Sequence, residues 1–140
     1  MEKPVRLSVR SVVEQVLRAG DIDSRFASPL AAMMDGAQAH RRLQKSMGSG
    51  YNKEVSLNIR LDVEGIPVLL HGRADGVWEE DGVFTIDEIK TTSSTLEKLF
   101  AQQELHLAQA KCYAYMLLQG MESPPENVRI QLTYFQLDTE

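Results

Sequence analysis

Apolar residues recur at helical spacing in the first 50 residues of the chain. One set follows Ser8, a residue type that caps helix N-termini, and comprises Val9, Val12, Val13, Val16 and Leu17. A second run extends from about Pro29 to Met47, with Ser28 as its N-cap, and Gly48-Ser49-Gly50 ends it. The pattern predicts two helices, the first of which stops at Gly20-Asp21.

The hydrophobic period changes to two after residue 50. Val55, Leu57, Ile59 and Leu61 alternate with polar residues, which is typical of a strand with one buried face. Two more strands are predicted from Ile66 to Trp78 and from Val83 to Lys90, with turns at Glu64-Gly65 and at Glu79 to Gly82. Because the connections are short, we expect an antiparallel meander.

Helical spacing returns in the last third of the chain. Leu96, Leu99 and Phe100 follow a cap-rich segment, and a long helix is predicted from about Glu104 to Gln119. Ser123-Pro124-Pro125 ends that helix, and alternation from Val128 to Leu137 predicts a last strand. The order α-α-β-β-β-α-β indicates an α+β fold, with a central, mostly antiparallel or mixed sheet flanked by helices.

The composition limits the classes of protein to which this chain can belong. A chain of 140 residues is the size of one domain, so we expect residues 1–140 to form a single unit. The net charge is −5, so binding of nucleic acid would depend on a local basic patch or on a metal ion. Cys112 is the single cysteine, which excludes an iron–sulfur cluster built by this chain. The sequence has neither the apolar stretch of a signal peptide nor a membrane-spanning run, so we expect a cytoplasmic protein without a membrane partner.

Charged residues interrupt the apolar pattern of the second and third strands. Asp75 lies in Gly72-Arg73-Ala74-Asp75-Gly76, and Asp87, Glu88 and Lys90 lie near the end of the next strand. Side chains alternate along a strand, so Glu88 and Lys90 share one face and Asp87 points to the other. We therefore pair Glu88, and not Asp87, with Lys90 and Asp75. Two carboxylates and a lysine suit a Mg²⁺ or Mn²⁺ site, although a surface salt-bridge cluster would have the same spacing.

The second predicted helix offers a histidine in its apolar stripe. His40 lies among Met33, Ala37, Leu43 and Met47, so it points inward as a ligand or as an ordinary core histidine. Gly36 precedes it by one turn, and glycine in the centre of a helix indicates close approach of another backbone.

The long helix carries Gln109 and Tyr113 four residues apart, with His106 one turn earlier. Tyr113 and Tyr115 could simply pack, and Gln109 could be solvated. Basic residues could surround the mouth of a site, or they could be an ordinary solvated surface: Arg41, Arg42, Lys45, Lys53, Arg73 and Lys98.

These motifs together resemble the PD-(D/E)XK nuclease superfamily. Gly36-x-x-x-His40, Gly72 to Gly76, Glu88-Ile89-Lys90-Thr91 and Gln109-x-x-x-Tyr113 follow one another in the order of that family, over residues 8 to 137. The resemblance implies a restriction-endonuclease-like fold and metal ligands at His40, Asp75, Glu88 and the carbonyl of Ile89. It implies that Lys90 orients the attacking water and stabilises charge on the phosphate. Gln109 and Tyr113 would brace the site or touch DNA. The charge arrangement adds Arg41 and Arg73 as further residues expected to bind DNA or brace the site.

The motifs look closest to the RecB-like branch of that superfamily. Ile86 to Lys90 and Ala108 to Tyr115 also look like the nuclease module at the front of DinG/XPD-type DNA helicases, which would make this domain part of a longer polypeptide. Several RecB-like relatives bind an iron–sulfur cluster through four cysteines, and this sequence departs from them.

The sequence thus predicts a domain that hydrolyses DNA with Mg²⁺ or Mn²⁺, in DNA repair or processing with a tethered helicase, on single strands or duplex ends. Asp75, Glu88 and Lys90 are the expected catalytic residues. A second interpretation is an inactive module that retains the fold for DNA binding or structural support. A third is a small ligand-binding or regulatory domain, for which a metal ion would have no effect.

Overall fold

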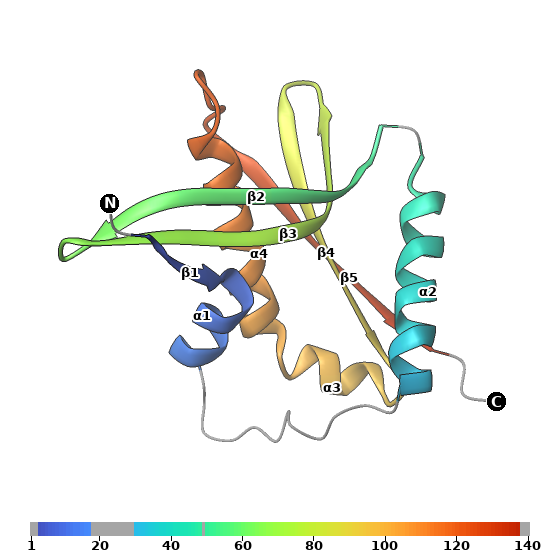
Figure 1. Ribbon diagram of the computed structural model, residues 1–140. Coiled ribbons are helices and arrows are strands. Elements are labelled where there is room, and N and C mark those ends of the chain that lie inside the picture. The colour runs from blue at the N-terminus through green and yellow to red at the C-terminus, as the bar shows by residue number, and fades with distance from the viewer. Residues whose placement is uncertain (1–2, 18–29, 49, 138–140) are drawn as a thin grey trace.

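The computed structural model describes residues 3–17, 30–48 and 50–137 of the chain (Figure 1). The elements in these ranges, in chain order, are β1 (Val5–Ser8), α1 (Val9–Val16), α2 (Leu30–Ser46), β2 (Asn52–Val63), β3 (Ile66–Glu80), β4 (Val83–Thr92), α3 (Leu96–Phe100), α4 (Gln103–Gln119) and β5 (Val128–Gln136). The expected helix stop at Gly20-Asp21 and the expected cap at Ser28-Pro29 lie outside the described residues.

The five strands form one mixed sheet in which β3 is the central element. β2 pairs antiparallel with β3 along nearly its whole length, from Val63↔Ile66 to Asn52↔Val77. The other edge of β3 is shared: β1 pairs with it in parallel at Val5↔Val68, and β4 pairs with it antiparallel from Gly76↔Asp87 onward. β5 then pairs in parallel with β4. On this edge, the N-terminal part of β3 therefore pairs with β1, and its C-terminal part pairs with β4.

The side-chain alternation of β3 shifts at Asp75. Ala74 and Val77 both belong to the hydrophobic core although they are three residues apart, so they cannot follow a strict period of two. Opposite Asp75, Glu54 of β2 has a left-handed backbone, with φ 49°, and stands outside the regular pairing. The two strands bend together here, which changes the direction of the Asp75 side chain as a bulge would.

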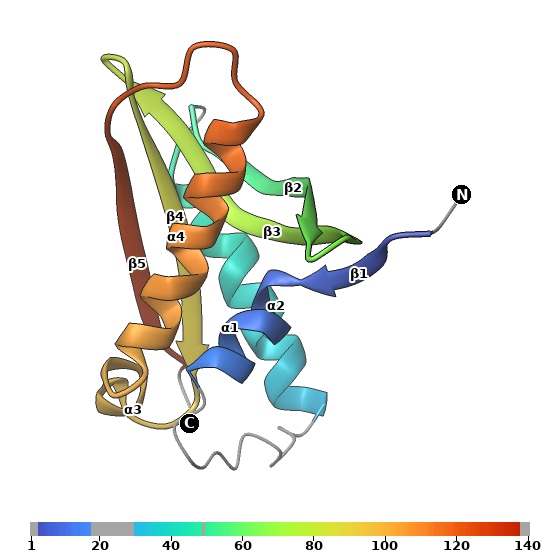
Figure 2. The same cartoon turned by 90° about the vertical axis from the view of Figure 1, so that its left-hand side faces the viewer.

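One face of the sheet is covered by α4, with α1 packed beside it (Figure 2). The core between them contains Val9 and Val13 of α1, Ala110, Tyr113, Ala114 and Met116 of α4, and Leu57, Ala74, Val77 and Ile86 of the sheet. α2 lies apart from these helices, beside the ends of β4 and β5, and contacts β4 (Figure 1). α2 is therefore placed to contribute to a site at the end of β4.

Most of the predicted elements are confirmed. Both N-terminal helices, the meander of β2, β3 and β4, the long α4 and the last strand lie within a few residues of the expected bounds. Ser8 caps α1 as expected, since its hydroxyl accepts a hydrogen bond from the Ser11 backbone N–H at 3.1 Å. The predicted order omits β1, because four residues are too short to establish a period of two, and it does not separate α3 from α4.

No helix in the described part of the chain is long and apolar enough to cross a membrane.

Gly72→Ala tests how closely β3 approaches α4. A methyl group at Gly72 would lie 2.6 Å from Cε1 of the buried Tyr113 ring and 3.3 Å from Cγ2 of Val9. We expect the free energy of unfolding to fall by about 1–3 kcal/mol, as for other overpacked cores, measured by urea denaturation. Gly120→Ala is the matched control, because its nearest neighbour would be the Leu117 carbonyl oxygen at 3.6 Å, and it should change stability by less than about 0.5 kcal/mol. Equal effects of the two substitutions would contradict this packing.

Candidate functional site

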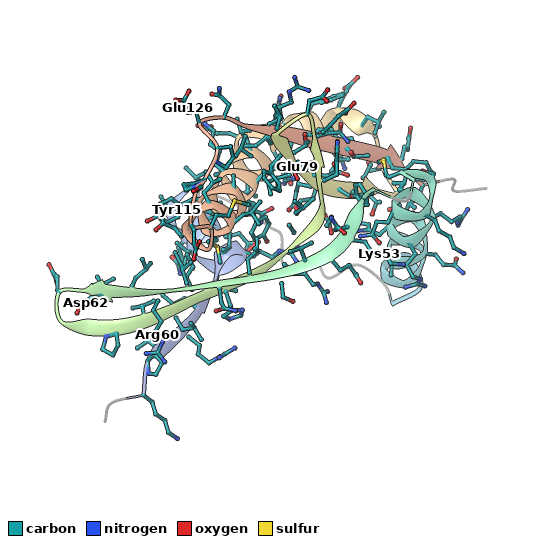
Figure 3. All side chains as sticks on the ribbon, turned by 90° about the horizontal axis from the view of Figure 1, so that it is seen from above. Lys53, Arg60, Asp62, Glu79, Tyr115 and Glu126 are labelled. Carbon is teal, nitrogen blue, oxygen red and sulfur yellow. The ribbon has the colours of Figure 1, made fainter. Side chains whose placement is uncertain are left out.

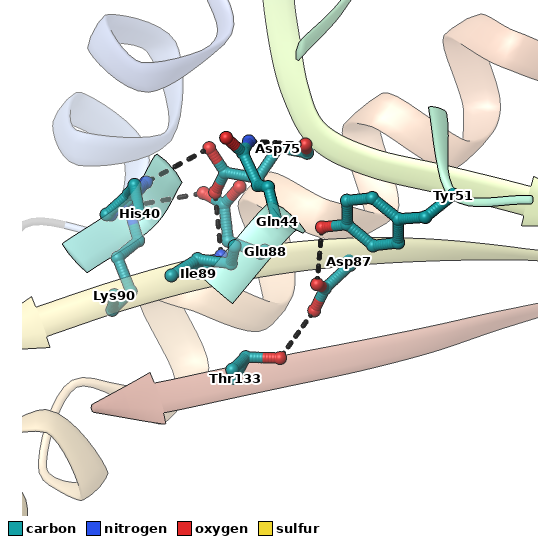
Figure 4. A network of polar contacts seen from close by, with 9 residues as sticks. All are labelled: His40, Gln44, Tyr51, Asp75, Asp87, Glu88, Ile89, Lys90 and Thr133. Carbon is teal, nitrogen blue, oxygen red and sulfur yellow. Dashed lines mark hydrogen bonds and ion pairs between the residues drawn. The ribbon is translucent and has the colours of Figure 1, made fainter. Parts of the chain in front are cut away.

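A cluster of polar side chains lies where β3 and β4 separate. The two strands pair only up to Gly76↔Asp87, so Asp75 on one strand and Glu88 and Lys90 on the other flank the opening. The ammonium of Lys90 is 3.2 Å from Oε2 of Glu88, and Oδ2 of Asp75 accepts a hydrogen bond from the Ile89 backbone N–H at 2.7 Å (Figure 4). The N–H and C=O of one strand residue point to the same edge, so the Ile89 carbonyl also faces the opening.

Two side chains of α2 complete the cluster. Nδ1 of His40 lies 3.6 Å from Oδ1 of Asp75, and one turn later the side-chain amide of Gln44 donates to the Asp75 backbone carbonyl at 2.9 Å (Figure 4). Gln44 is buried although it is polar, and its bond fixes the main chain at the bend of β3. Sequence reasoning missed Gln44; its position four residues after His40 is the one signal that could have identified it.

Two expectations about α2 were wrong. Ala37 was assigned to the buried stripe but is exposed, because the helix face that meets the sheet runs through Ala39, His40, Leu43 and Gln44 instead. Gly36 was expected to approach another backbone, but its neighbour is the side-chain hydroxyl of Thr91, which a Cβ atom would meet at 3.1 Å. The side chain of Met33 lies outside the described residues.

The two carboxyl groups of the cluster have opposite pKa shifts. The pKa of Glu88 is raised to about 7, chiefly by burial and also by the nearby charge of Asp75, against the opposing effect of Lys90. Burial also acts to raise the pKa of Asp75, but the contact with His40 and the hydrogen bond from Ile89 outweigh it, so this pKa is lowered. The hydrogen bond between the two groups raises the pKa of Glu88 and lowers the pKa of Asp75, as expected when a protonated Glu88 donates to the Asp75 carboxylate.

Asp87 lies on the opposite face of β4 from Glu88, as the strand period predicts. It is fully buried and accepts hydrogen bonds from the Tyr51 hydroxyl and the Thr133 hydroxyl, both at 2.7 Å, and from the Gln131 amide at 3.3 Å (Figure 4). The network joins β4 to β5 and to the segment before β2. Sequence reasoning missed Tyr51, because nothing in the sequence indicates which strand a tyrosine outside the periodic segments will meet.

α4 closes the cluster from the other side of the sheet. Gln109 and Tyr113 are buried, and burial together with the charges of Glu88 and Asp75 raises the pKa of Tyr113. His106 is also buried, its Nδ1 lies 2.7 Å from the Tyr134 hydroxyl, and burial near Lys90 lowers its pKa to about 4. Tyr115, in contrast, is exposed.

The basic residues do not join the cluster. Arg41 follows His40 but is exposed on the outer surface of α2, and Arg73 is exposed on β3 between the inward-facing Gly72 and Ala74. Arg42, Lys45, Lys53 and Lys98 are exposed as well.

The donor set fits a divalent cation in its chemistry. Asp75 and Glu88 supply carboxylate oxygens, His40 supplies a ring nitrogen, and the Ile89 carbonyl faces the same opening. Oε1 of Gln109 is buried and accepts no hydrogen bond from the described residues, so this acceptor lacks a donor on the α4 side of the cluster. In the described ranges, however, no three His, Cys, Asp or Glu side chains are already arranged to hold a metal, and Glu88 is engaged with Lys90 and Asp75. A cation that binds Glu88 would displace the proton that the raised pKa favours.

The raised pKa of Glu88 predicts a pH-dependent stability. Its pKa is above the ordinary 4.5 in the folded state, so its contribution is fully present below pH 4.5 and is lost as pH rises through about 7. A shift of this size corresponds to about 3 kcal/mol, and the lowered pKa of Asp75 acts at more acidic pH. We expect the free energy of unfolding without metal, measured with urea, to fall across this window and Glu88→Gln to remove most of the fall. Glu97→Gln, at an exposed position on α3, should leave the slope unchanged, and a wild-type slope in Glu88→Gln would contradict the assignment.

Known proteins resemble the chain in sequence pattern and in fold. A sequence profile described as the PD-(D/E)XK nuclease superfamily matches residues 3–140. A solved structure titled "Crystal structure of SSO0001" has a TM-score of 0.60 at 18% identity, a level that concerns the fold alone; the match covers 96% of this chain and 64% of that protein. No curated protein matches the chain. Members of the superfamily are typically nucleases that act on DNA with Mg²⁺ or Mn²⁺, which supports a metal-dependent nuclease type of function. The chain belongs to the PD-(D/E)XK nuclease superfamily.

Proposed function

We propose that this domain is a deoxyribonuclease that hydrolyses phosphodiester bonds at the opening between β3 and β4. The observation that carries the proposal is the convergence of Asp75, Glu88 and Lys90 there, with His40 of α2 against Asp75. The proposed metal ligands are His40, Asp75, Glu88 and the Ile89 carbonyl. A bound Mg²⁺ or Mn²⁺ would act as a Lewis acid and neutralise charge that develops on the phosphate.

Lys90 is the proposed partner of the phosphate. Its ammonium is held 3.2 Å from Glu88, and about a fifth of the side chain is exposed, so it can both reach a ligand and remain close to the carboxylates. There it can donate hydrogen bonds to a water molecule and to a phosphate oxygen. His106 and Tyr134 lie next to Lys90 in the fold, and the low pKa keeps His106 neutral, so it adds no positive charge that would compete with Lys90.

The surrounding residues position this group. Gln44 holds the backbone at Asp75, and the Ile89 N–H holds the Asp75 carboxylate, so one oxygen of Asp75 is already oriented toward His40. Gln109 and Tyr113 brace the opening from α4. Arg41 and Arg73 are the proposed contacts to the DNA backbone, and their exposed positions fit the weak, salt-dependent binding expected of a protein with a net charge of −5.

We also propose the RecB-like branch for this domain, and a place in DNA repair or processing in the cytoplasm. The resemblance of Ile86 to Lys90 and Ala108 to Tyr115 to helicase-associated nuclease modules supports a tethered DNA helicase as partner. Such a tether would supply the affinity that an acidic domain lacks by itself.

Neutral isosteres at the two acids test the site. In the wild type, Mn²⁺ should raise the melting temperature by linkage and support cleavage of a DNA oligonucleotide. We expect Asp75→Asn and Glu88→Gln to remove most of that rise and to abolish cleavage, measured by thermal denaturation and gel assay. Glu97→Gln should behave as wild type. Cleavage by the wild type that persists in EDTA, or by both variants at wild-type rates, would contradict the proposal.

Lys90→Ala should separate metal binding from turnover. It removes a cation that pairs with Glu88, so Mn²⁺ should bind as well as before or more tightly, while cleavage should fall by about 100-fold or more. Calorimetric titration and single-turnover cleavage measure the two quantities. If Lys90→Ala loses Mn²⁺ binding together with cleavage, Lys90 supports the structure of the site and takes no part in the chemistry.

His40→Gln decides whether this histidine is a ligand or a core residue. The side chain is about 30% exposed, and glutamine is similar in size and polarity, so the stability without metal should change by less than about 0.5 kcal/mol. Mn²⁺ affinity should fall, because an imidazole ligand is lost. The two quantities are measured by urea denaturation and calorimetry. Lost stability with intact Mn²⁺ affinity would make His40 a core histidine.

A further inference from the structure

A small aromatic hollow lies next to the proposed nuclease site. It has a volume of about 230 Å³ and is lined by Met47, Gly50, Tyr51, Trp78 and Glu80. Met47 directly follows α2, one turn beyond the Gln44 that bonds to Asp75, and the Tyr51 hydroxyl reaches Asp87, which adjoins Glu88 in β4 but faces the other side of the strand (Figure 4). A DNA strand that is bound at the site and runs along α2 would therefore pass this hollow.

The aromatic floor of the hollow is fixed in position. The rings of Tyr51 and Trp78 lie 5.5 Å apart between centroids, at 32° to each other. Tyr51 lies directly against the main chain of Gly76, where any Cβ atom would overlap its ring, and its hydroxyl donates to the buried Asp87 at 2.7 Å. The Tyr51 ring and its hydroxyl are thus both held in place, so the aromatic surface that lines the hollow is a rigid platform.

The chemistry of the hollow favours a nucleobase over a phosphate. Its volume is below the range of about 300–1,000 Å³ for drug-sized ligands, so it suits one flat ring system. Glu79, Glu80 and Asp81 surround the β3–β4 turn beside it, and three acidic residues disfavour a phosphate there. The carboxylate of Glu80 can instead accept a hydrogen bond from an exocyclic amino group, as carboxylates do from cytosine N4.

We propose that this hollow binds one unstacked base of a single-stranded DNA segment that enters the nuclease site. The base stacks on Tyr51 and Trp78, and Glu80 favours a base that carries an amino group. The inference rests on the proposed nuclease function and names its substrate: single strands or frayed ends, since the bases of an intact duplex cannot reach the platform.

Trp78 is the single tryptophan of the chain, so its fluorescence reports on this hollow alone. In EDTA, which prevents metal-dependent cleavage, the wild-type protein is titrated with a short single-stranded oligo(dC) that carries a terminal dye. Anisotropy of the dye measures binding, and Trp78 emission measures stacking. We expect emission to be quenched in proportion to binding, more strongly with oligo(dC) than with oligo(dT), and not with a blunt duplex or an abasic oligomer.

Substitution of the platform tests its contribution to binding. Tyr51→Ala should weaken binding of oligo(dC), and raise KM for single-stranded substrate with Mn²⁺, by about 5- to 150-fold, the range for loss of one base stack. Trp78→Leu should do the same, which keeps the test valid if Tyr51→Ala fails to fold. Tyr115→Ala is the matched control, because Tyr115 is an exposed aromatic residue of α4 that does not line the hollow and lies apart from Lys53 of β2 (Figure 3), and it should bind as wild type.

The outcomes separate this inference from the proposed function. Binding without quenching, or equal binding by Tyr51→Ala, Trp78→Leu and Tyr115→Ala, would overturn the base pocket even if Mn²⁺-dependent cleavage is intact. Absence of Mn²⁺-dependent cleavage in the wild type would overturn the nuclease function. Quenching that follows binding, together with a larger KM in the platform variants and an unchanged Mn²⁺-induced rise in melting temperature, would support the base pocket.

Discussion

The burial of two carboxyl groups beside one ammonium is the constraint on which the site depends. Glu88 is buried and Asp75 is about four-fifths buried where β3 and β4 separate, and a buried carboxylate costs several kcal/mol unless it is paired. Lys90 compensates one negative charge, and a shared proton reduces the other, which is why the pKa of Glu88 is raised. Lys90 alone therefore does not neutralise both carboxyl groups of the site, and a divalent cation is the ligand that would take the place of the shared proton.

The rest of the fold places and holds those two acids. The bend at Glu54 and Asp75 turns one acid toward the opening, Gln44 of α2 fixes the bend, and β5 supports β4 from behind through the Asp87 network. Adjacent residues of β4 have separate tasks because their side chains alternate: Glu88 faces the opening, and Asp87 anchors the strand. The same network orients Tyr51, so one strand connects the site to the aromatic hollow.

The sequence predicts the parts of this arrangement that depend on a repeated pattern. The period of two indicates that Glu88 and Lys90 share a face, and helical spacing indicates α1, α2 and α4. It does not predict β1, which is too short, or the shift at Asp75, which depends on how two strands bend together. Tyr51 carries no local signal, and Gln44 carries only its spacing of four residues from His40, since a tyrosine or glutamine gains such a partner through tertiary packing. The wrong assignment of Ala37 to the buried face of α2 has the same cause, because the elements that pack on a helix determine which of its faces is buried.

The order of the elements along the chain has a consequence for how the site forms. Asp75 and Glu88 come from a hairpin, so they approach each other through a short loop closure, early in folding. α2 precedes β3 in the chain and lies against β4, so His40 and Gln44 arrive through contacts of longer range. The hairpin alone can bring the two acids together, whereas their burial also needs α2 and α4 to pack against β4. Because that burial depends on contacts of longer range than the hairpin, we expect neutralising either acid to act mainly on the rate of unfolding rather than on the rate at which the hairpin nucleates.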